Sequence, residues 1–313
     1  MSTTERICLV HLVRETNGIE PFARFVRSYR EHEVGAEHDL VLLYKGFAGS
    51  EAVSAHRELM DGLRFEERFI SDHGFDVDAY QRVGTQLARS RYCFVNSYSQ
   101  VLADGWLAGL DNALRAPDVG LAGASGSWAS IFSYVFYELR LPSAYSEVFP
   151  DYRQTRERMR RVSEQADPSL AQRSRGPAWA VKGAWSVVER TVGFERYPAQ
   201  HVRTNAFAVR REVLARLRVP GVRRKAQAYR LESGRASLTN QVQRMGLRTV
   251  VTGRDGVIYE PAEWPQSETL WQGTQANLLV SDNQTDKYAH GDAATRELLS
   301  RYAWGRQACP SLA

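Results

Sequence analysis

Short apolar runs alternate with amphipathic stretches over about the first 125 residues, and this alternation constrains the fold more than any other feature. The runs are rich in aliphatic and aromatic residues, as buried parallel strands are. They cover residues 7–13, 38–44, 65–70, 91–96 and 118–122. The stretches between them, 21–30, 51–63, 76–89 and 104–114, are predicted helices. This order predicts an α/β fold with a mostly parallel central sheet and helices on both faces.

The second half of the chain divides into two parts. Residues 132–198 are basic and aromatic and are broken by prolines, which predicts a helical insertion or lid. Regular secondary structure is predicted again after residue 198. The predicted strands are 201–209 and 248–252, and the predicted helices are 211–217, 237–245, 269–283 and 293–304. We therefore expect one globular unit made of residues 1–131, the insertion 132–198, and residues 199–313.

Charge is unevenly distributed along the chain. The net charge is +5, but residues 151–235 alone carry 20 Lys and Arg against 8 Asp and Glu. Basic segments attract phosphate groups, and basic sequence with aromatic neighbours also suits the surface of an anionic membrane. A solvated basic face with no specific partner is the alternative. Because no nucleic-acid-binding module is recognised, we expect no nucleic-acid partner.

Compartment and cysteine use follow from simple counts. The chain has neither a signal-peptide pattern at its start nor an apolar run of about 20 residues, which predicts a cytoplasmic protein, with peripheral contact to the inner membrane face as an option. Of the three cysteines, Cys8 and Cys93 lie in apolar runs and are predicted core residues. The spacing predicts neither a disulfide framework nor a zinc site.

One segment carries a specific resemblance. Residues 92–107 read YCFVNSYSQVLADGWL, an apolar strand followed by short polar residues, a turn and a helix that starts at Gly-Trp-Leu. This segment resembles the acidic strand-end motif of the family 2 glycosyltransferases, which have the GT-A fold of nucleotide-diphospho-sugar transferases. Residues 72–82 resemble the loop and helix that lie under the nucleotide in that family, and residues 204–213 resemble a later strand. The resemblance covers roughly residues 7–125 and 200–255.

The resemblance implies a transfer of a sugar from a nucleotide-diphosphate donor to a hydroxyl of a saccharide, a lipid-linked molecule or a small molecule. It places the donor on residues 1–131 and the acceptor on residues 199–313. Ligands of such sheets bind beyond the carboxyl ends of the strands. The donor-binding candidates near these ends are His11, Lys45, Asp72, Asp76, Asn96, Tyr98 and Ser99.

The expected metal position departs from the family pattern. In the family the last Asp of the motif holds Mg²⁺ or Mn²⁺, whereas Tyr98 stands there in this chain, and these metals prefer carboxylate oxygens. Three alternatives stay open. In the first, a different carboxylate, Asp72 or Asp104, holds the metal. In the second, cationic residues stabilise the leaving diphosphate instead of a metal. In the third, the protein is a non-catalytic relative that binds its ligand without transferring a sugar. The cationic candidates are Arg203, Arg235, Arg254 and Lys287.

An inverting transfer also needs a carboxylate that removes the proton of the acceptor hydroxyl. The resemblance places it shortly before the predicted helix 237–245, where Glu232 is the match and Asp282 is a second candidate. Alternatively, Glu232 caps that helix or pairs with a neighbouring arginine.

The predicted acceptor contacts come from two segments. His201, Arg203 and Asn205 alternate on one face of the predicted strand 201–209. Trp264 supplies an aromatic face of the kind that stacks on a sugar ring. A solvated strand face, and a closing helix with Trp271 in the core, are the respective alternatives.

Overall fold

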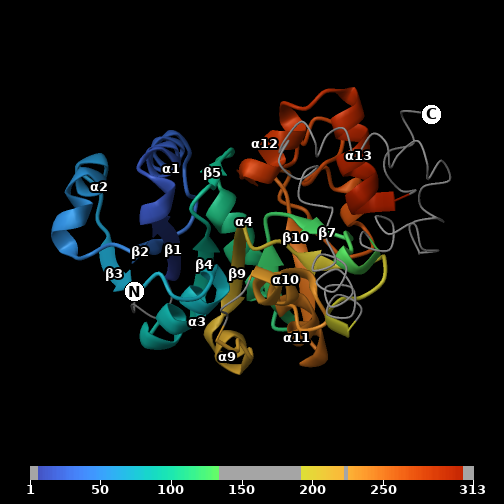
Figure 1. Ribbon diagram of the computed structural model, residues 1–313, viewed down its shortest axis with the longest axis horizontal. Helices are drawn as coiled ribbons and strands as arrows, with labels where there is room; N and C mark the ends of the chain where they lie inside the picture. The colour runs from blue at the N-terminus through green and yellow to red at the C-terminus, as the bar shows by residue number, and fades with distance from the viewer. Residues whose placement is uncertain (1–5, 134–191, 222–224, 306–313) are drawn as a thin grey trace, which may run out of the picture.

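The computed structural model describes residues 6–133, 192–221 and 225–305, and its centre is a mixed sheet of eight strands (Figure 1). The strand order is β11-β10-β6-β9-β4-β1-β2-β3, in which β9 and β11 run antiparallel to their neighbours. The bounds are β1 Ile7–Arg14, β2 His38–Lys45, β3 Glu66–Ile70, β4 Arg91–Val95, β6 Val119–Gly123, β9 Ala206–Arg210, β10 Arg248–Thr252 and β11 Ile258–Tyr259. The predicted mostly parallel sheet is confirmed.

Helices cover both faces of this sheet because its strands are apolar on both sides. On β1, Cys8, Val10 and Leu12 face one core, and Ile7 and Leu9 face the other. The first core contains α3 Asp76–Gln86, α9 Arg211–Arg216, α10 Lys225–Ser233 and α11 Leu238–Arg244. The second contains α1 Glu20–Glu31, α2 Ser54–Leu59 and α4 Trp106–Arg115. In Figure 1, α1 and α2 lie above the sheet, with α3 and α9 below it.

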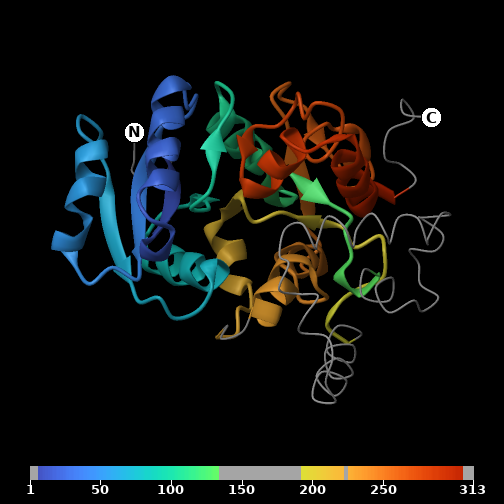
Figure 2. The same cartoon turned by 45° about the horizontal axis from the view of Figure 1, so that its top comes forward.

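The segment that follows β11, residues 260–305, packs beside the main sheet and ends in the red helices of Figure 2. A small sheet ties it there by joining β5 Gln100–Val101 to β12 Val280–Ser281. Another small sheet joins β7 Gly126–Ser127 to β8 His201–Val202, in the segment before β9. Two helices, α12 Asn283–Ala289 and α13 Ala293–Trp304, complete the segment 260–305. The fully buried Trp304 lies 6.2 Å, centroid to centroid, from Trp128 and donates from Nε1 to the Leu270 carbonyl at 2.8 Å.

Two predicted elements of the second half of the chain are wrong. The helix predicted at 269–283 is a series of turns, because Trp271 and Gln275 have φ values of 49° and 56° that an α-helix does not allow. The strand predicted at 201–209 is interrupted at residues 203–205. Its first part pairs with β7 in one sheet and its second part pairs with β4 and β6 in another.

Two further outcomes concern the middle of the chain. Helix α10 was not predicted, so Glu232 lies within the last turn of a helix rather than in a loop before one. The predicted insertion 132–198 falls mostly outside the described residues. Among the described residues, no helix combines the length and the apolar character needed to cross a bilayer.

Candidate functional site

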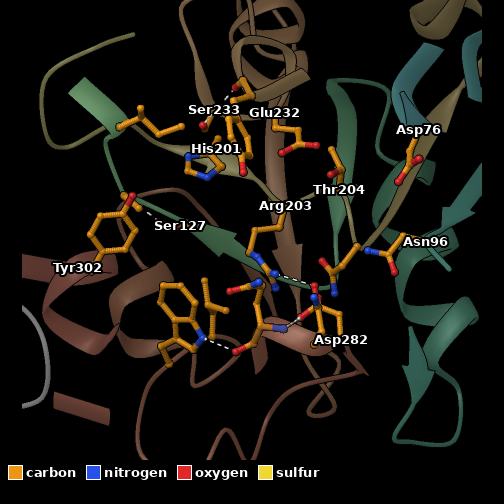
Figure 3. A pocket seen from close by; sticks show the side chains of 18 of the residues that line it. Asp76, Asn96, Ser127, His201, Arg203, Thr204, Glu232, Ser233, Asp282 and Tyr302 are labelled. Carbon is orange, nitrogen blue, oxygen red and sulfur yellow. Dashed lines mark hydrogen bonds and ion pairs between the residues drawn. The ribbon is translucent and has the colours of Figure 1, made fainter. Parts of the chain in front are cut away.

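A cavity of about 740 Å³ lies at the carboxyl edge of the sheet (Figure 3). Its walls come from the start of α3, the loop after β4, the segment from β7 to residue 131, and Phe194. The other walls are β8 and the segment between β8 and β9, residues 270–271, and α10, α12 and α13. Seven of the predicted site residues line it: Asp76, Asn96, His201, Arg203, Asn205, Glu232 and Asp282. The structure thus gathers side chains separated by more than 200 positions in the sequence.

Two of the predicted site residues are in the core instead. His11 is fully buried on the α1 face of the sheet, with its ring 3.6 Å from that of Phe25, centroid to centroid, and nearly parallel to it. Trp264 is also fully buried, and its Nε1 donates to the Tyr259 carbonyl at 3.0 Å. Gly126 permits this packing, since a Cβ there would lie 2.5 Å from the Trp264 ring. The predictions of donor contact for His11 and acceptor contact for Trp264 are therefore wrong.

A charged cluster occupies the ends of β1, β2 and β3. The Asp72 Oδ1 atom lies 3.3 Å from Arg14 Nη2 and 3.7 Å from the Nζ atom of the buried Lys45, which donates to the Gly74 carbonyl at 2.7 Å. Burial, with the nearby Arg14 charge, lowers the pKa of Lys45. Asp72 and Lys45 thus lie beside the cavity rather than in its wall, where they hold the loop that leads into α3.

Asp76 begins α3 and extends this cluster into the cavity. Burial raises its pKa, while the Arg14 and Lys45 charges act in the opposite direction. Its Oδ1 atom is buried and has no hydrogen-bond partner among the described residues. Buried polar atoms are nearly always paired in proteins, so Asp76 is suited to accept a hydrogen bond from a ligand.

Asn96 and Tyr98 occupy the expected metal position at the end of β4. Asn96 Oδ1 accepts from the Tyr98 backbone N–H and the Ser99 hydroxyl, both at 2.9 Å. The Ser99 hydroxyl is itself buried, 2.9 Å from the Asn205 carbonyl. These side chains therefore build a turn, and no carboxylate stands among them. Because divalent metals of this kind need carboxylate or free carbonyl oxygens, the Asn96–Tyr98 position does not fit Mg²⁺ or Mn²⁺.

The alternative metal carboxylates do not complete a site either. Asp104 is 72% exposed at the start of α4, where it pairs with His32 at 3.1 Å, and it does not line the cavity. The described residues contain no group of three or more His, Cys, Asp or Glu side chains arranged to hold a metal ion.

Arg203 and Asp282 form a buried ion pair in the cavity wall. Arg203 Nη2 lies 2.6 Å from Asp282 Oδ2, and Arg203 Nη1 donates to the Ser125 hydroxyl at 3.3 Å. Asp282 also caps α12, since its Oδ1 accepts from the backbone N–H groups of Gln284 and Thr285, each at 3.0 Å. Both oxygens of Asp282 are thus engaged. Of the four cations predicted to meet the diphosphate, Arg203 is the one that lines the cavity.

His201 and Glu232 lie on the same side of the cavity (Figure 3). His201 Nδ1 is 2.7 Å from the Ala199 carbonyl, so Nδ1 carries the proton and Nε2 is left as an acceptor. Burial lowers the pKa of His201 to about 4, and the ring is therefore neutral at pH 7. Asn205 is structural, because it accepts from Ser125 at 3.0 Å and donates to the Val280 carbonyl at 3.1 Å.

The sequence did not single out Tyr229 and Tyr302, which also line the cavity. Both belong to helices with weak amphipathic patterning, α10 and α13, so no signal separated them from core or surface aromatics.

Comparisons with known proteins give distant similarities. No family model matches the chain, and no curated protein matches it. Among solved structures, residues 1–349 of TarS from S. aureus, in complex with UDP-GlcNAc, are 9% identical with a TM-score of 0.29, over 38% of this chain and 33% of that chain. The mannosyltransferase PcManGT from Pyrobaculum calidifontis, in complex with GDP-Man and Mn²⁺, is 12% identical with a TM-score of 0.41, over 82% of this chain and 56% of that chain.

The chain thus matches about a third of the TarS fragment and about half of the mannosyltransferase. Because a shared fold does not define an activity, function is argued from the site itself.

Proposed function

We propose that the protein transfers a sugar from a nucleotide-diphosphate donor to a hydroxyl group of an acceptor, with inversion at the sugar carbon. The observation that carries this proposal is one cavity, at the ligand-binding edge of an α/β sheet, that contains Glu232 together with the strand-end groups Asp76 and Asn96. Asp76 and Asn96 bind the donor, and Glu232 serves the acceptor.

In the proposed reaction the acceptor oxygen attacks the sugar carbon while Glu232 takes the hydroxyl proton. The bond between the sugar carbon and the phosphate oxygen breaks, and the nucleoside diphosphate leaves with that electron pair. His201 orients the acceptor, because its Nε2 atom accepts a hydrogen bond from a second hydroxyl. Both His201 Nε2 and the Glu232 carboxylate accept hydrogen bonds, and this suits a ligand rich in hydroxyl groups.

The leaving diphosphate needs positive charge nearby. Arg203 is the candidate in the described cavity wall, and its guanidinium has five N–H donors, of which the contacts to Asp282 and Ser125 use part. No step is assigned to a metal, because the Asn96–Tyr98 position does not fit one.

The test of this proposal uses Glu232→Gln. Purified protein is incubated with UDP-, GDP-, dTDP- and CDP-sugars, and release of the nucleoside diphosphate is measured with candidate acceptors. We expect Glu232→Gln to lower turnover by at least about 10²-fold, because proton removal is lost. Donor binding should be unchanged. The matched control is Glu212→Gln, which makes the same change at an exposed residue of α9. Full turnover in Glu232→Gln would show that this carboxylate is not the base.

A second candidate function is binding without catalysis. The turn at Asn96 and Tyr98 favours it, since it lacks the carboxylate of the family motif. A protein of this kind would bind a nucleoside diphosphate but release none from any nucleotide sugar, with or without Mn²⁺.

A further inference from the structure

A loop between η4 (the 3₁₀ helix Trp264–Gln266) and β12 has an unusual backbone. Three residues that are not glycine, Glu268, Trp271 and Gln275, have φ values of 53°, 49° and 56°. This left-handed region is unfavourable for side chains with a Cβ, and for a bulky residue such as tryptophan it is rare. Such conformations persist where surrounding contacts hold them, often at sites that clamp a ligand.

Four hydrogen bonds hold this loop in place. The Trp271 backbone N–H donates to Gln275 Oε1 at 3.0 Å, and Gln275 Nε2 donates to the Thr285 carbonyl at 3.1 Å. Gln272 Nε2 donates to the Trp264 carbonyl at 2.7 Å. The indole Nε1–H of Trp271 donates to the Gln284 carbonyl at 3.0 Å. The indole ring is therefore fixed, and its one donor is already used.

Leu270 and Trp271 of this loop and Tyr302 of α13 line one side of the cavity, which we call the aromatic wall. The rings of Trp271 and Tyr302 lie 6.3 Å apart, centroid to centroid, and are inclined at 43°. Only 8% of Trp271 is exposed, so its ring is a rigid part of the wall and not a mobile side chain. Figure 3 shows Tyr302 on the side of the cavity away from Asp76 and Asn96.

We propose that the aromatic wall binds the apolar face of a pyranose ring of the acceptor. That this sugar is the acceptor rests on the proposed function, whereas the binding of a pyranose at the aromatic wall does not. A pyranose carries C–H groups on its face and hydroxyls around its rim. The face packs on Trp271 and Tyr302, while rim hydroxyls donate to His201 and Glu232 across the cavity.

The polar groups that line the cavity favour a sugar over a hydrocarbon chain as the occupant. Arg203 and His201 line the same space as the aromatic wall. A hydrocarbon chain would remove water from these groups without replacing its hydrogen bonds, which is unfavourable. The hydroxyls of a sugar replace those bonds, and a cavity of about 740 Å³ is large enough for a ligand of this kind.

The test observes Trp271 directly. The full chain is labelled with 5-fluorotryptophan, and its seven tryptophan signals are followed by ¹⁹F NMR. The Trp271 and Trp106 signals are assigned by substituting each residue with Phe in turn. The probes are methyl pyranosides of glucose, galactose, mannose and N-acetylglucosamine, each at roughly 20 mM to reveal a millimolar affinity, and octan-1-ol. Trp106 is the internal reference, because it is fully buried on the opposite face of the sheet.

At least one pyranoside is expected to shift the Trp271 signal and to leave that of Trp106 in place. Trp271→Leu should weaken binding of that pyranoside about tenfold, through loss of ring contact. The proposal is overturned if no pyranoside shifts the Trp271 signal, or if octan-1-ol alone does.

Failure here is distinguishable from failure of the proposed function. The same samples are tested for stabilisation by nucleoside diphosphates. If these bind while no pyranoside reaches Trp271, the donor site stands and the aromatic wall is not an acceptor platform.

Discussion

His11 is a fully buried titratable residue of the core. Both ring nitrogens are buried without a hydrogen-bond partner among the described residues, and the ring stacks on Phe25. Burial lowers the pKa of His11 from 6.5 to about 3. Below pH 6.5 the unfolded chain therefore binds a proton that the folded protein does not, so the free energy of unfolding falls as the pH drops from about 6.5 towards 3.

We predict that His11→Phe stabilises the protein more at acid pH than at neutral pH. At pH 5 the extra gain over that at pH 8 is about 2 kcal/mol, since each pH unit below 6.5 contributes about 1.4 kcal/mol. Urea unfolding of both proteins at pH 8 and pH 5 measures it. His201, whose pKa is also lowered by burial, stays in both proteins and does not affect the difference. An equal effect at the two pH values would contradict the account of His11.

His11 also shows that its place along the chain did not predict which face of the sheet its side chain lies on. His11 was selected as a residue at the end of the first strand, but β1 continues beyond it to Arg14. Its side chain faces α1, because the alternation of β1 assigns it to that side. The family resemblance led to Asp76, in the segment 72–82, and to Glu232, and both line the cavity.

At the scale of the elements, the start of α12 links stability to the site. Asp282 caps this helix and also pairs with Arg203, and it is 3% exposed. Asp292 caps α13 in the same way, accepting from the Thr295 backbone N–H at 2.7 Å, but it is exposed and forms no ion pair with the residues that the structure describes. Substitutions at these two residues therefore distinguish the contribution of the helix cap to stability from that of the buried ion pair.

We predict that Asp282→Ala destabilises the protein by roughly 3–5 kcal/mol, because it leaves the Arg203 charge buried and uncompensated. Asp292→Ala should cause a clearly smaller loss, and Asp282→Asn, which keeps the cap, an intermediate one. Urea unfolding at pH 7 compares the three variants. Equal losses for the two alanine variants would mean that the ion pair contributes little.

The elements themselves were predictable where the pattern was strong. The alternating runs before residue 125 gave the correct strands and helices, since burial on both faces produces continuous apolar runs. Helix α10 was missed because its sequence is basic and weakly amphipathic. The helix predicted at 269–283 was wrong because side chains such as Gln272 and Gln275 bond to distant backbone carbonyls, and these contacts leave no periodic trace in the sequence.

At the scale of the whole molecule, the cavity exists only when the chain has folded completely. The sheet supplies Asp76 and Asn96, the segment before β9 supplies Arg203, and the last third of the chain supplies the aromatic wall. The pairing of β5 with β12 and of β7 with β8 brings these parts together. A ligand that bridges them should therefore stabilise the whole protein against unfolding.

The measurement that tests the central claim most directly is thermal unfolding with UDP, GDP, dTDP and CDP, each with and without Mg²⁺ or Mn²⁺. A ligand at about 100 times its dissociation constant adds roughly 2.7 kcal/mol, which raises the unfolding midpoint by several degrees in a chain of this size. We predict such a shift with at least one nucleoside diphosphate in the absence of metal, and a smaller shift in Asp76→Asn. A shift that requires the metal would contradict our account of the Asn96–Tyr98 turn, and no shift under any condition would contradict the donor site itself.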